Sequence, residues 1–384
     1  MRIVVIGAGT LGLSTALNLA QRGVSVTVIE ADHAASGSSG RSVGVVGTQH
    51  VDRFEIQMRA LSVRQMLGWK EHGLDFRHIG YMRLGRTAED LELFARSVAI
   101  QAEFGLNHAR VLSRSEIKRL VPHISTDGIE GALFGPQDGY VDPHLLCGLL
   151  VEMIRERGGV VKQRCRLQSA DRTGAGYRLE TSAGSFDCDG VVMAAGAWAS
   201  KVAALFGHAL RVVPERHEAV NIRLAEPLDY VMPMVMDYVP GSGGTGLNFR
   251  YERPDELITE FHRPKATEGI DPDDYDQDIS EATKVELAEL LLERLPGLPG
   301  AGFGRGWAGL YPTSQDGRPL VGPIGDDEPM LIAAAGAGGY GIQLAPIIGS
   351  LAADWITEGQ PVSLPEAVRL KPSAARNATT ASAR

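Results

Sequence analysis

Three glycines and one acid near the start of the chain have types and a spacing suited to holding a phosphorylated ligand. Gly7, Gly9 and Gly12 follow a β-branched stretch and lead into an apolar stretch with helical spacing. The first glycine permits a tight turn, the second a close approach to a pyrophosphate, and the third close packing of the helix. The helix start adds unpaired N–H groups and a positive dipole end. Glu30 ends the next apolar stretch, about 20 residues on, where an acid binds a ribose diol. The pattern predicts an adenine dinucleotide without a 2′-phosphate.

A second glycine-rich stretch with the same design lies near the far end of the chain. The residues 329–334 have the pattern of a buried strand, Gly338, Gly339 and Gly341 follow, and an amphipathic helix continues from Ile342. A nicotinamide enzyme usually needs one such loop. A flavin ring gains from a second helix start at its pyrimidine edge, where negative charge develops on reduction. The pair of loops therefore favours a flavin, the alternative being a tight turn in a parallel sheet.

Size and composition narrow the class of protein. With 384 residues, 44% of them hydrophobic and 22% charged, the chain is expected to fold into two domains. The net charge of −9 disfavours nucleic acid and anionic membranes as partners. Cys147, Cys165 and Cys188 lack the spacing of a metal site, so we expect buried thiols and no metal. No membrane span or targeting segment is evident, which predicts a cytoplasmic protein.

The order of the expected elements predicts an α/β fold built on a Rossmann-like domain that is discontinuous in sequence. Between its pieces the pattern becomes extended and alternating, which indicates a second domain with a mixed antiparallel sheet, of α+β type, for the substrate. The tail is rich in small and polar residues and is expected to be disordered. The predicted boundaries are 1–75, 142–212 and 304–365 for the nucleotide domain, 76–141 and 213–303 for the substrate domain, and 366–384 for the tail.

The chain resembles flavoproteins of the D-amino-acid oxidase type, in particular glycine oxidase and the sarcosine oxidase β subunits. The resemblance covers about residues 1–360. It rests on VVIGAGTLGLSTALNLAQRG with VTVIE, GSSGRSVG, GVVMAAGAWAS, WAGLYPTSQDGRPLVG and AAGAGGYGIQLAPIIG. It implies bound FAD and the oxidation of a carbon–nitrogen bond in an amine or amino acid to an imine, by hydride transfer to flavin N5. The substrates implied are N-substituted amino acids, opine-like compounds or D-amino acids.

The resemblance also implies which residues would bind FAD. They lie in the first loop and the strand after it, in the stretch along the ribityl chain and the flavin face, beside the adenine, and in the late glycine loop. These residues are Gly7, Gly9, Thr10, Leu11, Gly12, Glu30, Ala31, Ser38, Ser39, Arg41, Ser42, Gly44, Leu167, Ala195, Gly196, Trp198, Gly339, Tyr340, Gly341, Ile342 and Gln343.

The substrate side departs from the pattern of the family. Glycine oxidase carries two arginines that clamp a substrate carboxylate, and their places here hold Tyr311 and Gly339. An arginine pair at these places is therefore absent. The candidates for the substrate pocket are Tyr311, Tyr340, Arg250, His262 and Arg263, each of which could instead be a packing aromatic, a solvated charge or a structural histidine. Because the reaction needs a neutral amine rather than removal of a carbon proton, we expect no general base.

The family resemblance also bears on whether the flavin is attached covalently and on which molecule accepts its electrons. Monomeric sarcosine oxidases tether the flavin through a cysteine near the place of Leu310, and dimethylglycine-type relatives through a histidine near residues 38–44. Neither residue type stands there, so we expect non-covalent FAD. The acceptor would be O2 or, in a hetero-oligomeric dehydrogenase, a partner subunit; a homo-oligomer is equally open. A nicotinamide-dependent dehydrogenase and a non-catalytic nucleotide-binding protein are the alternatives from other classes.

Overall fold

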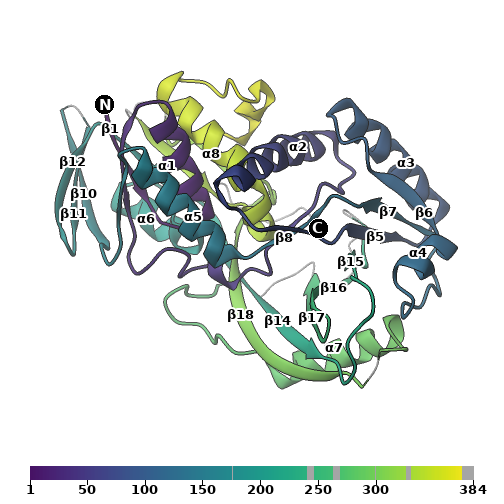
Figure 1. Ribbon diagram of the computed structural model, residues 1–384. Helices are drawn as coiled ribbons and strands as arrows, with labels where there is room; N and C mark the ends of the chain where they lie inside the picture. Colours follow the sequence, from purple (N-terminus) through teal and green to yellow (C-terminus); the bar gives the residue numbers. More distant parts are fainter. Residues whose placement is uncertain (175, 240–245, 263–268, 299, 326–329, 374–384) are drawn as a thin grey trace.

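The two glycine loops predict strand–loop–helix units of a parallel sheet. The structure contains this sheet, which has six strands (Figure 1). The computed structural model describes residues 1–174, 176–239, 246–262, 269–298, 300–325 and 330–373. Five neighbouring strands run parallel in the order β20-β13-β1-β2-β9, and β19 joins antiparallel at the β20 edge. Their bounds are β1 Arg2–Ile6, β2 Ser25–Ile29, β9 Val160–Lys162, β13 Gly190–Met193, β19 Leu320–Pro323 and β20 Leu331–Ala335.

The sequence of β1 is a continuous apolar run because both faces of this strand are buried. Ile3 and Val5 belong to the core on one face of the sheet, and Val4 and Ile6 to the core on the other. A strand of a parallel sheet covered on both faces buries every side chain. One face carries α1 (Thr10–Gln21), α5 (Pro143–Glu156) and α8 (Gly341–Thr357). The other carries α6 (Ala199–Leu205) and a meander of β10 (Leu167–Thr173), β11 (Gly176–Thr181) and β12 (Gly184–Cys188).

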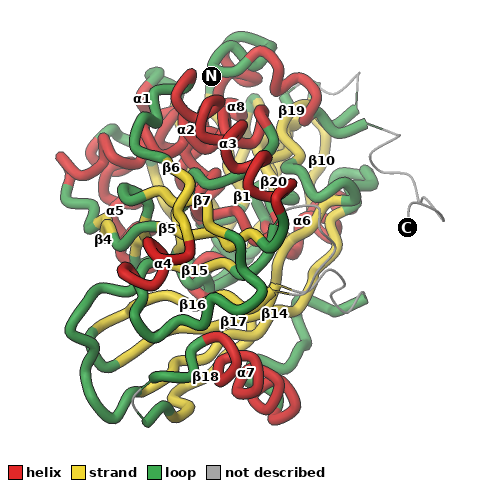
Figure 2. The backbone as a smooth tube through the Cα atoms, turned by 90° about the vertical axis from the view of Figure 1, so that its right-hand side faces the viewer, coloured by secondary structure: helices red, strands yellow, loops and turns green. Residues whose placement is uncertain are grey.

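Helices α1 and α8, each of which follows a glycine loop, lie side by side (Figures 1 and 2). A Cβ atom added at Gly349 would stand 2.6 Å from the backbone carbon of Ser14, so the two backbones approach too closely for a side chain there. At the other end of α8, the buried carboxylate of Asp354 accepts hydrogen bonds from Arg22 Nη2 and from the backbone N–H of Ser363, both at 2.6 Å. This packing fixes the two helix starts relative to each other.

A second, eight-stranded sheet has the order β18-β14-β17-β16-β15-β5-β7-β6, antiparallel except between β15 and β5. It has its own core, to which α7 and α4 contribute. The fold class expected from the sequence is thus confirmed. The bounds are β5 Tyr81–Gly85, β6 Arg110–Ser113, β7 Gly131–Gly135, β14 Val212–Arg223, β15 Met234–Met236, β16 Gly246–Arg253, β17 Glu256–His262, β18 Gly302–Ser314, α3 Ala88–Glu103, α4 Arg114–Leu120 and α7 Glu281–Arg294.

Two expected boundaries fall inside strands, the one between 212 and 213 inside β14 and the one between 303 and 304 inside β18. The sequence analysis divided the chain between 303 and 304, but β18 is a single strand that pairs along its length with β14. Glycine alternates with larger residues on both sides of position 303, so the sequence gives no signal that a strand ends there. Strands β14 and β18 extend from the eight-stranded sheet toward the start of α8, where η4 (Gly338–Tyr340) contacts β18 (Figure 1). The remaining division into two domains stays a proposal.

The start of the expected disordered tail is ordered. Residues Pro365–Leu370 form a 3-10 helix, η5, and Leu364, Ala367 and Leu370 are buried in the core beside α8. Side chains three residues apart line up along a 3-10 helix, so these three share one face. Three segments lie outside the described residues: 374–384 of that tail, 240–245 of the loop that the sequence predicts at 240–246, and Asp326 with Asp327, where it predicts a turn.

Short elements complete the chain. Helix α2 (Arg53–Gly68), continued by η2 (Trp69–His72), packs on α8, and a small sheet of β3 (Val45–Val46), β8 (Gly139–Val141) and β4 (Phe76–His78) lies beneath. The 3-10 turns η1 (Ser39–Arg41) and η3 (Gly196–Trp198) border the site described below. Cys147, Cys165 and Cys188 are buried and unbridged, as expected. Across the described ranges, every helix is too short or too polar to span a bilayer.

Candidate cofactor and substrate site

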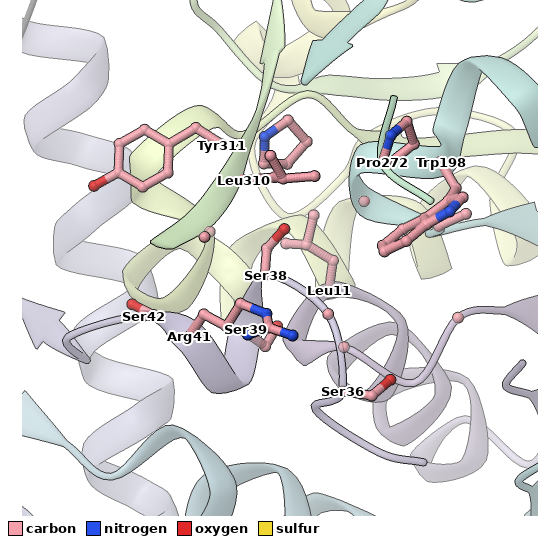
Figure 3. Close-up of a pocket in the computed structure, with 18 of the residues that line it drawn as sticks. Leu11, Ser36, Ser38, Ser39, Arg41, Ser42, Trp198, Pro272, Leu310 and Tyr311 are labelled. Atoms are coloured by element: carbon pink, nitrogen blue, oxygen red, sulfur yellow. The ribbon is translucent and has the colours of Figure 1, made fainter. Parts of the chain in front are cut away.

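A cavity of about 550 Å³ runs from the carboxyl ends of the parallel strands to the eight-stranded sheet. Both glycine loops line it, through Gly7, Gly9 and Thr10 at the start of α1 and through Gly339 and Gly341 at the start of α8. Figure 3 shows Leu310 and Tyr311 on a strand at one side, Ser38, Ser39 and Arg41 opposite, and Trp198 beside Pro272 at one end. The cavity therefore joins segments from both extremities of the chain.

The first loop leaves room for a ligand only because it is made of glycine. Gly7 has φ +108°, and a Cβ atom there would stand 2.5 Å from the backbone oxygen of Ala194. A Cβ at Gly12 would stand 2.0 Å from the oxygen of Gly7, so this glycine lets α1 begin directly behind the loop. At Gly9 the nearest neighbour of such an atom is Ser39 Oγ at 3.1 Å, and the remaining space belongs to the cavity.

Polar groups beside this loop are held in place by backbone N–H donors. The two carboxylate oxygens of Glu30 accept hydrogen bonds from the N–H of Ala8 at 2.8 Å and of Asp32 at 2.9 Å. The carboxylate still has lone pairs for a ribose diol. Ser38 Oγ lines the same cavity, is buried, and has no hydrogen-bond partner among the described residues. A buried hydroxyl without a partner is costly, so it fits a polar group of a ligand.

The second helix start presents a similar surface. Ala337, Gly338 and Gly339 line the cavity just before α8, and no side chain caps the first N–H groups of that helix. Gly338 has φ +52°, a backbone conformation that favours glycine. The free N–H groups and the helix dipole can stabilise negative charge in a ligand. The site therefore suits a ligand that carries negative charge at two places.

An acidic segment, residues 271–278, crosses one end of the cavity; we call it the strap. Pro272, Asp273, Tyr275 and Gln277 line the cavity, and Lys201 Nζ donates hydrogen bonds to Asp271 at 2.6 Å and to Asp273 at 2.5 Å. Asp273 also accepts from Trp198 Nε1, and Gln277 from Arg41. The sequence analysis does not predict these contacts, because an acidic run usually marks a solvated turn.

The opposite wall is formed by one face of the eight-stranded sheet. In antiparallel pairing, residues directly opposite each other point to the same side. The register pairs His217 with Gly309, Ala219 with Glu260 and Glu215 with Tyr311. The imidazole of His217 stacks on the ring of Tyr311, with centroids 3.8 Å apart. Burial, and then the nearby charge of Glu260, holds the pKa of Tyr311 well above its usual range, so its phenol keeps its proton.

Comparison with known proteins decides what this site binds. Residues 2–355 match the family DAO, FAD dependent oxidoreductase. The chain belongs to this family. It is an FAD-dependent oxidoreductase, and the two helix starts, the carboxylate of Glu30 and the unpartnered Ser38 hydroxyl fit a bound FAD. The nicotinamide and non-catalytic alternatives are thereby set aside.

Individual known proteins are similar to this oxidoreductase in sequence or in structure. A glycine oxidase of Geobacillus kaustophilus is 25% identical over 366 residues, which cover 92% of each chain. A mitochondrial sarcosine dehydrogenase of Mus musculus is 28% identical over 94% of this chain, although the chain spans only 40% of that protein. The crystal structure of an L-proline dehydrogenase from P. horikoshii superposes with a TM-score of 0.84, at 27% identity, over 95% of both chains.

Most of the residues that we expected to bind FAD line the cavity of the oxidoreductase, and Tyr311 lines it on the substrate side. Whether each contacts FAD remains a proposal. The residues so placed are Gly7, Gly9, Thr10, Leu11, Glu30, Ala31, Ser38, Ser39, Arg41, Ser42, Leu167, Ala195, Gly196, Trp198, Gly339, Gly341 and Ile342.

Four other expected residues do not line the cavity. Gly12 packs behind the first loop. Gly44, with φ +70°, lets β3 approach Val141, whose oxygen would be 2.0 Å from an added Cβ atom. The side chain of Gln343 accepts a hydrogen bond from the N–H of Gly47 at 3.0 Å and so faces β3. The Tyr340 ring lies under the guanidinium of Arg59, and its hydroxyl is 3.4 Å from that of Tyr238.

Of the three basic candidates for a substrate carboxylate, the structure describes the side chain of Arg250 alone. Arg250 is buried. Its Nε donates a hydrogen bond to Val43 O at 2.9 Å, and its Nη1 donates to Tyr251 O and Glu252 Oε2. Its guanidinium lies 3.8 Å from the centroid of the Tyr140 ring. These contacts join the strands to each other, and Arg250 is not among the residues that line the cavity. The side chain of His262 and all of Arg263 lie outside the described residues.

Several cavity residues escaped the sequence analysis, namely His217 on β14, Glu260 on β17, Lys201 on α6 and the strap residues. A signal was present for Glu260. The stretch Leu257 to Phe261 has the pattern of a buried strand, and a carboxylate within such a strand is unusual without a function or a partner. No comparable signal marks Lys201, which is an ordinary basic residue on a short helix.

Removal of the strap's ion pairs should loosen the hold on FAD only slightly. Lys201 and its two partners are about half exposed, and exposed ion pairs contribute little and are screened by salt. We expect Lys201→Met to raise the rate of FAD release about threefold at low ionic strength. The difference should vanish at about 0.5 M salt. Fluorescence of released FAD after dilution measures this rate.

The matched control for this variant is Lys284→Met. Lys284 also makes a surface ion pair, with Glu281 on α7, but does not contact the strap. It should leave FAD release unchanged. Equal release rates in Lys201→Met and Lys284→Met at low salt would show that the strap does not hold the cofactor.

Proposed function

We propose that this oxidoreductase oxidises the C–N bond of an amine or amino acid to an imine, with an N-substituted amino acid, an opine-like compound or a D-amino acid as substrate. The observation that carries the proposal is the single cavity, which runs from both helix starts to the polar wall of the second sheet. FAD, when bound, supplies the acceptor for a hydride from the carbon that bears nitrogen. The residues of the chain orient the substrate, exclude water and set its protonation state.

The wall explains why the carboxylate clamp of glycine oxidase is not expected here. A Cβ atom at Gly339 would stand 2.5 Å from the ring of Tyr311. The tyrosine therefore occupies the space that a side chain at position 339 would need, and the two departures from the family pattern are coupled. A phenol that keeps its proton can donate one hydrogen bond, but it brings no positive charge. This supports a substrate that is not held at this place by paired arginines.

The names of the relatives give the first substrates to test. They specify glycine, sarcosine and L-proline, the last two of which are secondary amines. The holoprotein would be mixed without oxygen with these three, with D-amino acids, with other N-methyl amino acids and with opines, while the flavin absorbance is followed. Bleaching by one of them supports the proposal. Absence of bleaching with every member of this panel would refute it.

The electron acceptor separates two versions of the proposal. Likeness to an L-proline dehydrogenase over 95% of both chains favours an enzyme that passes electrons to a partner rather than to oxygen. A dehydrogenase should form little peroxide when the purified chain turns over in air, whereas an oxidase forms one peroxide for each imine. Size-exclusion chromatography of the purified chain tests the oligomer, and cell fractionation tests the expected cytoplasmic location.

The rate of flavin reduction should depend on pH in a defined direction. A neutral amine has the lone pair that the departing hydride requires, and an ammonium ion does not. We therefore expect the rate with a saturating substrate to rise with pH as the bound amine loses its proton. Stopped-flow measurements between about pH 6 and pH 10 test this. A flat profile with a tightly bound substrate would contradict the proposed mechanism.

A further inference from the structure

A carboxylate stands on the substrate side of the cavity in the second sheet. Glu260 is half-buried on β17, between Ala219 on β14 and Asn248 on β16. The side chain of Asn248 is hydrogen-bonded to it. Because paired residues share a face, Glu260 stands on the same side of the sheet as His217 and Tyr311, all three of which line the cavity.

The charges on this wall are predominantly negative. Among the residues that the structure describes, Arg250 is the cation whose charge acts on Glu260, and Arg250 is itself paired with Glu252 at 2.5 Å. Glu215, opposite Tyr311, adds a second carboxylate, which accepts a hydrogen bond from Thr313. The two places that hold arginine in glycine oxidase are Tyr311 and Gly339 in this chain, and the carboxylate of Glu260 stands on the same face of the sheet as Tyr311. A wall of this kind attracts a cation and repels a carboxylate.

We propose that Glu260 binds the ammonium group of the substrate and takes its N–H proton before the C–N bond is oxidised. The inference rests on the proposed function, which assigns no residue to accept the proton of the substrate amine. In this step the ammonium N–H bond breaks, its electron pair stays on nitrogen, and the proton bonds to a carboxylate oxygen of Glu260. The products are a neutral amine and a neutral carboxylic acid, so charge and atoms balance. The substrate class is an amine, primary or secondary, whose nitrogen rather than carboxylate meets this wall.

The surroundings of Glu260 suit this exchange. Burial raises its pKa to about 7, against the opposing charge of Arg250 and the hydrogen bond from Asn248. A carboxylate with such a pKa is a stronger base than an exposed one and is still ionised near neutral pH. The charged and titratable groups that face it from the neighbouring elements are Arg250 and its partner Glu252 on β16, Glu215 and His217 on β14, Tyr311 on β18 and Arg41 of η1.

The same burial indicates that Glu260 does not serve the fold. Its pKa is higher in the folded protein than in the unfolded chain, so the folded state binds the proton more tightly. Stability is therefore greatest below the unfolded pKa and falls as pH rises toward about 7. Glu260→Gln keeps the shape and removes this loss. We expect its melting temperature at about pH 8 to match or exceed that of the unaltered protein.

The binding test uses two small, branched probes of opposite charge, tetramethylammonium and trimethylacetate. Neither can be oxidised by loss of hydride next to a nitrogen lone pair, so each reports binding alone. We expect holoprotein at about pH 8 to bind the cation about tenfold more tightly than the anion, as shown by perturbation of the flavin spectrum. Glu260→Gln should abolish that preference. Affinity for the cation should also rise with pH as Glu260 ionises, a measurement that needs no variant.

The control variant is Asp255→Asn, which removes an equal charge from the exposed turn of the same β16–β17 hairpin. It should keep the preference for the cation. If holoprotein shows no preference, or Glu260→Gln keeps it, or cation binding is flat from about pH 6 to pH 9, the inference is overturned. The substrate panel remains a separate result. Bleaching in the panel without charge preference would refute the role of Glu260 alone, and charge preference without bleaching would refute only the proposed function.

Discussion

Gly9→Val is expected to yield a folded but colourless protein. The backbone of Gly9, with φ −78°, accepts a side chain without strain, and the only close neighbour of an added Cβ is the hydroxyl of Ser39. A valine side chain would instead occupy the cavity at the start of α1, where the pyrophosphate of FAD must approach the backbone. We expect FAD affinity to fall by at least about a hundredfold, or about 3 kcal/mol. Titration of apoprotein with FAD, followed by flavin fluorescence, measures the loss.

The control for this prediction is Gly148→Val in α5. Gly148 is exposed, and nothing lies within 4 Å of an added Cβ atom there. The variant should keep the FAD affinity of the unaltered chain. Circular dichroism of the Gly9→Val apoprotein should match that of the unaltered apoprotein. A yellow Gly9→Val protein with unchanged affinity would mean that the first loop is not where FAD binds.

Gly349→Ala is expected to destabilise the protein, although the same change in another helix should stabilise it. Alanine is favoured over glycine within helices by about 1 kcal/mol. At Gly349, however, the new methyl group would meet the backbone of Ser14 at 2.6 Å, and α1 cannot yield without moving the first loop. Overpacking against backbone typically costs about 1–3 kcal/mol and occasionally more. We expect a net loss of about 2 kcal/mol in the free energy of unfolding, measured with urea.

Gly148→Ala is the matched control, since it makes the same change in α5 where an added methyl group meets nothing. It should raise the free energy of unfolding by up to about 1 kcal/mol. Gly349→Ala should also weaken FAD binding about tenfold, because the displaced α8 carries the second helix start away from the first. Equal stability of the two variants would show that the close contact between α1 and α8 is not required.

The residues that fit FAD follow the family pattern, whereas residues on the proposed substrate side differ from it. The loops at the two helix starts follow the family, and they specify FAD. Tyr311 and Gly339 depart from the pattern of glycine oxidase, and the two changes are coupled, because a Cβ atom at Gly339 would meet the ring of Tyr311. Substrate choice should therefore differ from that of a glycine oxidase even where the cofactor site is shared.

Much of the fold could be predicted from local patterns. Gly7, Gly9 and Gly12 with Glu30 identify the first strand, loop and helix, because each position has a local steric or hydrogen-bonding requirement that a reader of the sequence can check. Ser113 with Glu116 marks the start of α4 in the same way, and the structure contains that capping box. The second glycine loop likewise predicted a helix start, and α8 begins at Gly341. These features depend on neighbours in the sequence.

The candidate site was predicted only in part, because the rest depends on contacts between distant strands and helices. Glu260 meets His217 and Tyr311 through the register of β14, β17 and β18, and no pattern within one strand determines the register of another. Lys201 contacts the strap, which lies about seventy residues later in the sequence. Arg250 was a reasonable candidate until the fold placed Glu252 and Val43 on its donors. The sequence by itself determined the two dinucleotide loops, through short-range constraints, and its resemblance to a flavoprotein family implied FAD and the reaction class, whereas the tertiary structure decided which charges line the cavity.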